Sequence, residues 1–537
     1  MTIILLATEI GCQSLSQKNK KKNVSSTLRL NIQEDPQTLD PRRARSLVDQ
    51  TLVRMLFEGL TRVGKEEKAE LALADHVNVS DDLKIYTFYL KESVWANGDA
   101  VLASDFAYAW KKTLSPDFPS DLAFHLYVIK NAKKAKEGKI SLDEIGIKVL
   151  DDRTLQIELE KPTSYFLDLV ALPAFFPVNQ KVGEKNSSWA QNTTTFVGNG
   201  PFQLIEWKHQ DHLSLTKNSL YWDEPTVQIN SLELQMLQED TELKCFEKNE
   251  LDWAGSPLSR LPVASLNSLS KENKLRTKDF LGTYFIRTNT ETVPFCHPFM
   301  RKAFALAINR TDIVQHVAQG NQIPATGLVP LSLKLQKMQY FQDSDVFQAK
   351  QLFDQALIDL KLTKETLPEI ALLYSTSERN HLIAQALQQQ WFEAFGLRIK
   401  MESVEGKVYF SRVSKQDFQL STGSWIADFN DPINFLDVFK YKKGGSNNTH
   451  WENPRYVNLL DKAAQAIDPK ERMEFLSQSE QILIDEMPII PVFYYSMLYV
   501  NQPHLKDVVL SSLGQIDFKW ARIENCEKVI AKEEKNE

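Results

Sequence analysis

The order of apolar and polar positions predicts alternating strands and helices from the start of the folded chain. Residues 28–32 (LRLNI) have the composition of a strand, and residues 46–60 repeat apolar side chains at helical spacing until Gly59. Residues 84–90 (KIYTFYL) are rich in β-forming side chains, and residues 154–160 (TLQIELE) alternate apolar and polar positions as a half-buried strand does. These elements indicate an α/β or α+β protein.

Three later segments have the periodicity of helices. Residues 101–114 predict a helix with Ser104 as its N-cap, because a serine hydroxyl accepts a free first-turn N–H. Residues 297–320 carry a continuous apolar stripe, which predicts one core-facing helix closed by its final glycine. Residues 378–395 predict another helix with Gly396 as its C-cap, followed by a strand. Three large aromatic residues on these helices are expected in the core: Trp110, Phe304 and Trp391.

Length and composition restrict the fold and the partners. A chain of 537 residues exceeds the usual size of one hydrophobic core, so we expect two or more lobes. The composition, 42% hydrophobic and 25% charged, is that of a globular protein. Because the net charge is −7 and no basic stripe recurs, we expect no nucleic-acid partner. No apolar run is long enough to predict a membrane span.

The N-terminus resembles the end of a bacterial lipoprotein signal. A short apolar run and small residues precede Cys12, which we expect to be lipidated. Glu9 and the lack of a basic residue before Lys18 depart from this pattern, so a start further upstream and a frayed cytosolic N-terminus remain alternatives. Residues 13–26 are polar and basic, which predicts a tether that holds the folded body at a membrane surface.

The remaining cysteines and histidines do not indicate a metal site or an enzyme. Cys245, Cys296 and Cys526 lack metal-ligand spacing, and we expect buried thiols, with a Cys245–Cys296 disulfide as the alternative. His209 and His212 lie in a polar loop, and the chain has no GxxxxGK[ST], HExxH or GxSxG motif. We therefore expect no metal, no cofactor and no catalysis. A hydrolase with paired carboxylates is the remote alternative, because no such pair stands out.

Six motifs, in this order, resemble those of the family 5 extracellular solute-binding proteins of ABC importers, and of its oligopeptide-binding members above all. They are EDPQTLDP, MLFEGL, WANGDAVLASDFAYAWKK, GNGPFQLIEWKHQDHLSLTKNSLYWD, HPFMRKAFALAINRTDIV and WIADFNDPINFLDVF. The resemblance extends from Leu28 to about Ile523. It implies an α/β periplasmic-binding-protein-like fold in which two lobes close over a ligand about a hinge, with the first lobe split in two.

The resemblance also implies a domain division and a function. Residues 1–27 would be signal and tether, subdomain I would combine 28–56, 192–283 and 497–537, subdomain II would be 57–191, and lobe III would be 284–496. The implied protein is a monomer of the cell envelope, periplasmic and lipid-tethered, that captures short peptides and delivers them to an ABC permease in the inner membrane. A different solute, such as a murein peptide, nickel chelate, haem or sugar, is the alternative, because fold does not choose the ligand.

Peptides of varied sequence share a main chain and two charged ends, so we expect strand-like pairing and charge at the termini to bind them. By the resemblance, Asp428 binds the α-ammonium group, the alternative being an ordinary turn. Tyr108 and Tyr495 match ligand-facing tyrosines, the alternative being core aromatics. Other expected contacts are Ser424, Trp425, Ile426 and Ala427 on one strand edge, with Glu34 or Asp35 on the opposite side.

Two positions depart from the family pattern near the expected peptide C-terminus. Thr422 stands where similar members carry an arginine suited to a carboxylate, and Gly406 stands where a pocket tryptophan is expected. Arg412 and Lys415 are the substitutes that the sequence offers. We therefore expect a ligand-length preference unlike the di- to pentapeptide range that the family implies, or a modified peptide such as a cell-wall fragment.

Overall fold

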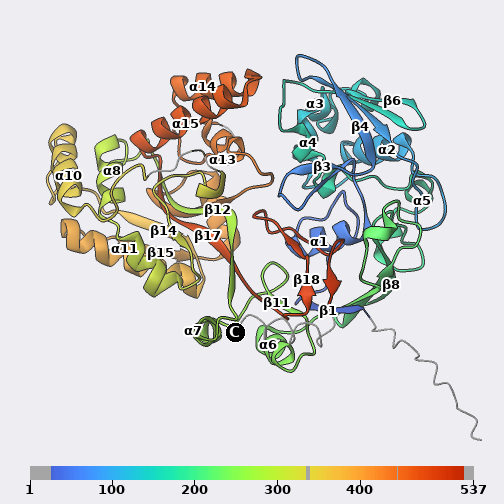
Figure 1. Ribbon diagram of the computed structural model, residues 1–537. Coiled ribbons are helices and arrows are strands. Elements are labelled where there is room, and N and C mark those ends of the chain that lie inside the picture. The colour runs from blue at the N-terminus through green and yellow to red at the C-terminus, as the bar shows by residue number, and fades with distance from the viewer. Residues whose placement is uncertain (1–25, 334, 336–338, 444, 525–537) are drawn as a thin grey trace, which may run out of the picture.

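The protein consists of two bodies joined by long strands (Figure 1). The computed structural model describes residues 26–333, 335, 339–443 and 445–524. The predictions on Cys12, on Cys526 and on residues 13–25 of the tether lie outside the described residues. Within the described ranges, no helix has the length and apolar character that crossing a membrane requires.

Two four-stranded sheets form the first body. One has the order β1-β10-β9-β8, in which β1 runs parallel to β10, and the other is the antiparallel sheet β4-β5-β7-β6. One hydrophobic cluster contains residues of both sheets and also Ile516 and Phe518 from near the C-terminus. The strands are β1 Thr27–Asn31, β4 Ala74–Val79, β5 Ile85–Leu90, β6 Ile147–Asp151, β7 Thr154–Glu158, β8 Phe202–Lys208, β9 His212–Lys217 and β10 Ser231–Gln235.

Among the described helices of the first body, α1 begins at a side-chain cap and α2 does not. Ser46 Oγ accepts from the Asp49 N–H at 3.0 Å and caps α1. The predicted N-cap of α2 is wrong: Leu102 occupies that position and its side chain caps nothing, while the Asp105 carboxylate accepts the Leu102 N–H at 3.0 Å. The elements are α1 Leu47–Leu56, α2 Ala103–Thr113, α3 Ala132–Lys136, α4 Phe166–Leu169, α5 Gln180–Lys185, α6 Glu239–Glu247, α7 Val263–Lys271, and the short strands β2 Thr61–Val63, β3 Ala69–Leu71, β18 Leu505–Lys506, β19 Val509–Leu510, β20 Ile516–Asp517 and β21 Arg522–Ile523.

A seven-stranded sheet forms the centre of the second body and extends to the first. Its order is β11-β17-β12-β16-β14-β15, with β13 beside β17. β12 (Arg276–Thr288) and β17 (Ile489–Asn501) are 13 residues long, and β11 (Trp253–Gly255) pairs with the far end of β17. In Figure 1 both long strands run down to the base of the molecule, where β11, α6 and α7 lie. The other strands are β13 Ile323–Pro324, β14 Ala371–Ser375, β15 Lys400–Val404 and β16 Leu420–Ile426.

Helices pack around this sheet with a second hydrophobic cluster, so each body has its own core. α11 has the predicted bounds, because Ser377 caps its start and Gly396, with φ 73°, ends it. The predicted two-lobed α/β fold is confirmed, whereas the subdomain boundaries stay a prediction. The helices are α8 Pro298–Leu306, α10 Val346–Leu360, α11 Glu378–Phe395, α12 Gly406–Ser414, α13 Ile433–Leu436, α14 Pro454–Gln465 and α15 Pro469–Glu486.

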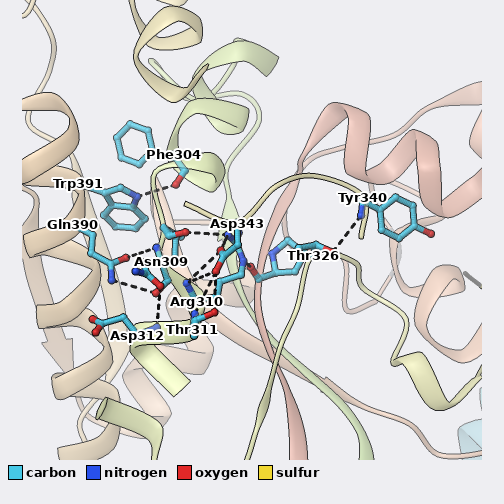
Figure 2. A network of polar contacts seen from close by, with 12 residues as sticks. Phe304, Asn309, Arg310, Thr311, Asp312, Thr326, Tyr340, Asp343, Gln390 and Trp391 are labelled. Atoms are coloured by element: carbon cyan, nitrogen blue, oxygen red, sulfur yellow. Dashed lines mark hydrogen bonds and ion pairs between the residues drawn. The ribbon is translucent and has the colours of Figure 1, made fainter. Parts of the chain in front are cut away.

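The single helix predicted over residues 297–320 is wrong. α8 ends at Leu306, the short α9 (Arg310–Asp312) follows, and residues 313–318 form a π-helical turn. The break lies at Asn309: the Gln390 side chain donates to its carbonyl at 3.3 Å and accepts from its N–H at 2.9 Å (Figure 2). Asn309 Oδ1 then caps the Asp312 N–H at 2.9 Å. The segment ends in Gln319, which adopts a left-handed conformation with φ 50°, rather than in the final glycine.

Buried polar contacts tie the helices of the second body together. Arg310 is fully buried, and its Nη1 donates to Asp343 Oδ1 at 2.9 Å (Figure 2). Trp391 Nε1 donates to the Phe304 carbonyl at 2.9 Å. The core assignments of Phe304, Trp391 and Trp110 are confirmed, since each is 0% exposed.

Cys245 and Cys296 are free thiols, so the disulfide alternative is wrong. Cys245 is half-buried. Cys296 is exposed, because it lies in the surface turn that precedes α8, and its predicted burial is therefore also wrong.

Candidate functional site

β16 has one fully paired edge and one largely open edge. All seven of its residues pair with β12, from Leu420 opposite Thr288 to Ile426 opposite Gly282. β14 pairs only with Leu420 and Ser421, so among the described residues no strand covers the same side from position 422 onward. An open strand edge presents N–H and C=O groups that can pair with another extended chain.

The register shows which backbone groups lie at the open edge. The Ala427 N–H donates to the Leu281 carbonyl at 2.8 Å, on the β12 side. Backbone groups of successive residues in an antiparallel strand point to opposite sides. The N–H and C=O groups of Thr422, Ser424 and Ile426 therefore point to the open edge. The side chains of Ser424 and Ile426 are exposed, Trp425 is half-buried and Ala427 is buried.

Asp428 lies just beyond the end of this edge. Asn434 Oδ1, at the start of α13, accepts from the Asp428 N–H at 3.3 Å and from Trp425 Nε1 at 2.8 Å. Burial raises the pKa of the Asp428 carboxyl to about 6, and a hydrogen bond with the Asn434 side chain opposes that shift. No cation of the described chain contributes to this pKa, so the carboxylate has no charge partner there. A half-buried acid in this state is suited to bind a cationic group of a ligand.

The loop that carries Asp428 is held on both sides. Arg472 donates to the two oxygens of Asp431, each at 2.8 Å, in a nearly buried fork. The Phe429 ring stacks on the Tyr165 ring of the first body with centroids 4.8 Å apart. Asn430 Nδ2 donates to the Glu67 carbonyl, also of the first body, at 3.0 Å. Asp428 is therefore positioned where the two bodies meet.

Tyr495 lies close to the same edge. Burial raises the pKa of its hydroxyl, while Arg379 and a hydrogen bond with Ser424 lower it. The Arg379 guanidinium lies 5.9 Å from the centroid of the Tyr495 ring. The structure thus brings Tyr495 together with Ser424.

Thr422 is buried, and its carbonyl, rather than its side chain, is the group that reaches the edge. The carbonyl accepts from Arg287 Nη1 at 2.8 Å and from the Tyr409 hydroxyl. Sequence reasoning missed Arg287, Tyr409 and Asn434, because their contacts depend on strand pairing and on the turn into α13. The available signal was Arg287, the one charged residue in the second part of β12, residues 280–288.

The other predicted residues lie elsewhere. Asp35 accepts from Trp207 Nε1 at 2.9 Å and lies 2.9 Å from His209 Nδ1, whereas Glu34 is exposed. Tyr108 lies on α2, with the Arg42 guanidinium 5.9 Å from its ring centroid. Within the described ranges, no hydrogen bond, ion pair or ring contact joins Glu34, Asp35 or Tyr108 to the β16 edge.

The substitutes considered for the missing arginine are not at the edge either. Arg412 binds Glu402 and Asp417, each at 3.0 Å. Lys415 is exposed at the end of α12, and Gly406 is the first residue of that helix. The charge of Arg412 is therefore already compensated.

Comparisons with known proteins identify the family. The family model "Bacterial extracellular solute-binding proteins, family 5 Middle" matches residues 68–447. The oligopeptide-binding protein OppA of Bacillus subtilis (strain 168) is 39% identical over 528 residues, which cover 97% of each chain. The unliganded open form of the murein tripeptide binding protein MppA superposes with a TM-score of 0.82 at 27% identity, covering 94% of this chain and 98% of the other. Haemophilus influenzae OppA in complex with RPPGFSPFR gives a TM-score of 0.75 at 25% identity, covering 94% of this chain and 100% of the other. The chain belongs to the bacterial extracellular solute-binding proteins of family 5.

Proposed function

We propose that this protein binds short peptides between its two lobes and delivers them to an ABC permease without changing them chemically. The open edge of β16, with the uncompensated carboxylate of Asp428 at its end, carries the proposal. The family membership and the peptide-binding relatives support it.

In this proposal the peptide adds a strand to β16. Its main chain pairs with the open N–H and C=O groups of Ser424 and Ile426, and its α-ammonium group binds Asp428. Because Asp428 follows the C-terminal end of β16, the peptide runs antiparallel to that strand. Main-chain pairing is indifferent to side-chain identity, and water fills the space around varied side chains.

The first lobe completes the site when the two lobes close. Glu34 is the better candidate of the two acidic residues, because Asp35 already accepts two side-chain hydrogen bonds. Tyr495 contributes from β17, and Trp425 is held by Asn434 so that its backbone stays in register. Tyr108 is a weaker candidate, since its hydroxyl packs closely against Gly183 of α5.

Location and assembly are part of the same proposal. The family is extracellular. We propose that Cys12 carries a lipid, that the following residues tether the body to the membrane, and that the protein acts as a monomer. Replacement of Cys12 by alanine is expected to release the protein from the membrane fraction of the producing cell; retention there would contradict the tether.

Isothermal titration of trialanine into the protein, followed by mass spectrometry of the peptide, tests the function. A dissociation constant near micromolar, about −8 kcal/mol, is expected, with the peptide recovered intact. No binding of any di- to pentapeptide would contradict the peptide assignment. A peptide-cleaving activity that co-purifies with the protein would contradict the non-enzymatic role. A murein tripeptide as the better ligand would favour the alternative solute on the same scaffold.

A further inference from the structure

Arg287 is a half-buried cation at the end of the β16 edge remote from Asp428. Its Nη1 donates to the Thr422 carbonyl at 2.8 Å, and its guanidinium lies 5.2 Å from the Phe285 ring centroid. Its Nε is buried and has no hydrogen-bond partner. Among the described residues, no carboxylate forms an ion pair with it. A guanidinium has five N–H donors, so most of its binding capacity is unused.

Gly423 explains how a side chain from β12 reaches the far edge of β16. A Cβ atom at position 423 would collide with Nη1 and Cζ of Arg287. Because glycine leaves this space free, the Arg287 side chain passes across β16 and meets the Thr422 carbonyl. That carbonyl points to the open edge by the alternation described above. The charge of Arg287 therefore lies at the edge of β16 where the proposed peptide binds.

The Thr422 carbonyl and the Tyr409 hydroxyl keep the guanidinium in place. The Tyr409 hydroxyl donates to the same Thr422 carbonyl, and burial lowers the pKa of Arg287 while Tyr409 raises it. An arginine with a lowered pKa is still charged at neutral pH. Burial removes water from the Arg287 guanidinium. A ligand carboxylate beside it would compensate for that loss by accepting a charge-assisted hydrogen bond.

The spacing of the two charged groups selects a ligand length. In an antiparallel pairing, a peptide whose first residue lies opposite Ile426 has its third residue opposite Ser424. The ammonium group then extends toward Asp428, and the carboxylate extends toward Thr422 and Arg287. At about 3.4 Å per residue, the carboxylate of the third residue reaches the level of Gly423, over which the Arg287 guanidinium lies, whereas a dipeptide ends about one residue short of it and a fourth residue would place the carboxylate beside the Thr422 carbonyl oxygen.

We propose, on the basis of the function above, that Arg287 binds the C-terminal carboxylate of the peptide and favours tripeptides. It takes the place of the arginine that position 422 lacks. The ligand class is a zwitterionic tripeptide, with Asp428 and Arg287 binding its opposite ends.

Calorimetric titration of trialanine and trialanine amide tests the assignment. Amidation is expected to weaken binding to the unaltered protein at least 30-fold and to weaken binding to Arg287→Gln less than 3-fold. Arg412→Gln, which removes a guanidinium that is already paired, is the matched control and should keep the full amide effect. In the series from dialanine to pentaalanine, the tripeptide should bind most tightly.

A second variant covers the case in which Arg287→Gln does not fold. Gly423→Ala keeps the charge but blocks the path of the side chain, and it should also lose most of the amide effect. An undiminished amide effect in either variant, or its loss in Arg379→Gln instead, would overturn the assignment. If no peptide from dialanine to pentaalanine binds the unaltered protein, the proposed function fails; if trialanine binds and amidation has no effect there, or another length binds and trialanine does not, only the role of Arg287 fails.

Discussion

Tyr165 of the first lobe and Phe429 of the second stack with ring planes 5° apart and centroids separated by 4.8 Å. Both rings pack against both hydrophobic clusters, so this pair joins the two cores. Asp428 directly precedes Phe429. The contact between the lobes and the proposed ammonium site are therefore linked through one peptide unit.

The stack should be detectable as a coupling free energy. Tyr165→Leu and Phe429→Leu keep much of the apolar area but remove the ring pair. A double-mutant cycle on the free energy of unfolding in urea is expected to give a coupling of about 0.5–1.5 kcal/mol. Additive effects of the two substitutions would show that the rings do not interact in solution.

The stability of the ligand-free protein should depend on pH through Asp428. Because its folded pKa is raised to about 6 from 3.8, the folded state favours the protonated form, and the stability this supplies is complete below about pH 4 and lost as pH rises through 6. Asp428→Asn should thus raise the free energy of unfolding by up to about 3 kcal/mol at pH 8 and hardly change it at pH 4. Thermal unfolding at both pH values measures this. If the substitution had an equal effect at pH 4 and pH 8, Asp428 could not be a buried carboxylate without a charge partner.

Peptide affinity should show the opposite dependence on pH. Binding to the ammonium group requires ionised Asp428, so affinity should rise about tenfold per pH unit up to about pH 6. Above about pH 8 it should fall again, because the peptide amine loses its proton. Titrations at pH values from about 4.5 to about 9 test both limbs of the affinity curve. Asp428→Asn should flatten the acidic limb, and an acidic limb that persists in this variant would exclude Asp428 as its cause.

The buried pair of Arg310 and Asp343 should be far more important for stability than an exposed pair. Asp343→Ala leaves the fully buried guanidinium of Arg310 without its carboxylate, which should cost about 3–5 kcal/mol. The matched control is Asp417→Ala, which breaks a surface pair with Arg412 and should cost less than about 1 kcal/mol. Chemical denaturation compares the two variants. Equal losses would show that Arg310 is rehydrated when Asp343 is removed.

Local signals in the sequence were sufficient for some elements and not for others. α11 could be predicted to the residue, because Ser377 and Gly396 define its ends within the chain itself. The helix over 297–320 could not, since the break at Asn309 depends on Gln390, which is distant in sequence. Periodicity reports which face of a segment is apolar, but it does not report a side chain that takes over backbone hydrogen bonds.

The candidate site shows the same division. Asp428 and the strand before it were identifiable from a resemblance in one continuous motif, WIADFNDP. Arg287 was not, because its place at the edge is set by the register of β12 against β16 and by the absence of a side chain at Gly423. The sequence of either strand alone does not show which residues meet across a sheet.

The central claim is that Asp428 binds the α-ammonium group of a peptide, and N-acetylation of the ligand tests it most directly. Calorimetry should compare trialanine with N-acetyl-trialanine, for the unaltered protein and for Asp428→Asn. Acetylation is expected to weaken binding to the unaltered protein at least about 100-fold, as the loss of one partner of a buried pair requires, and to change binding to Asp428→Asn less than about 3-fold. Equal affinity of the unaltered protein for both peptides would contradict the claim.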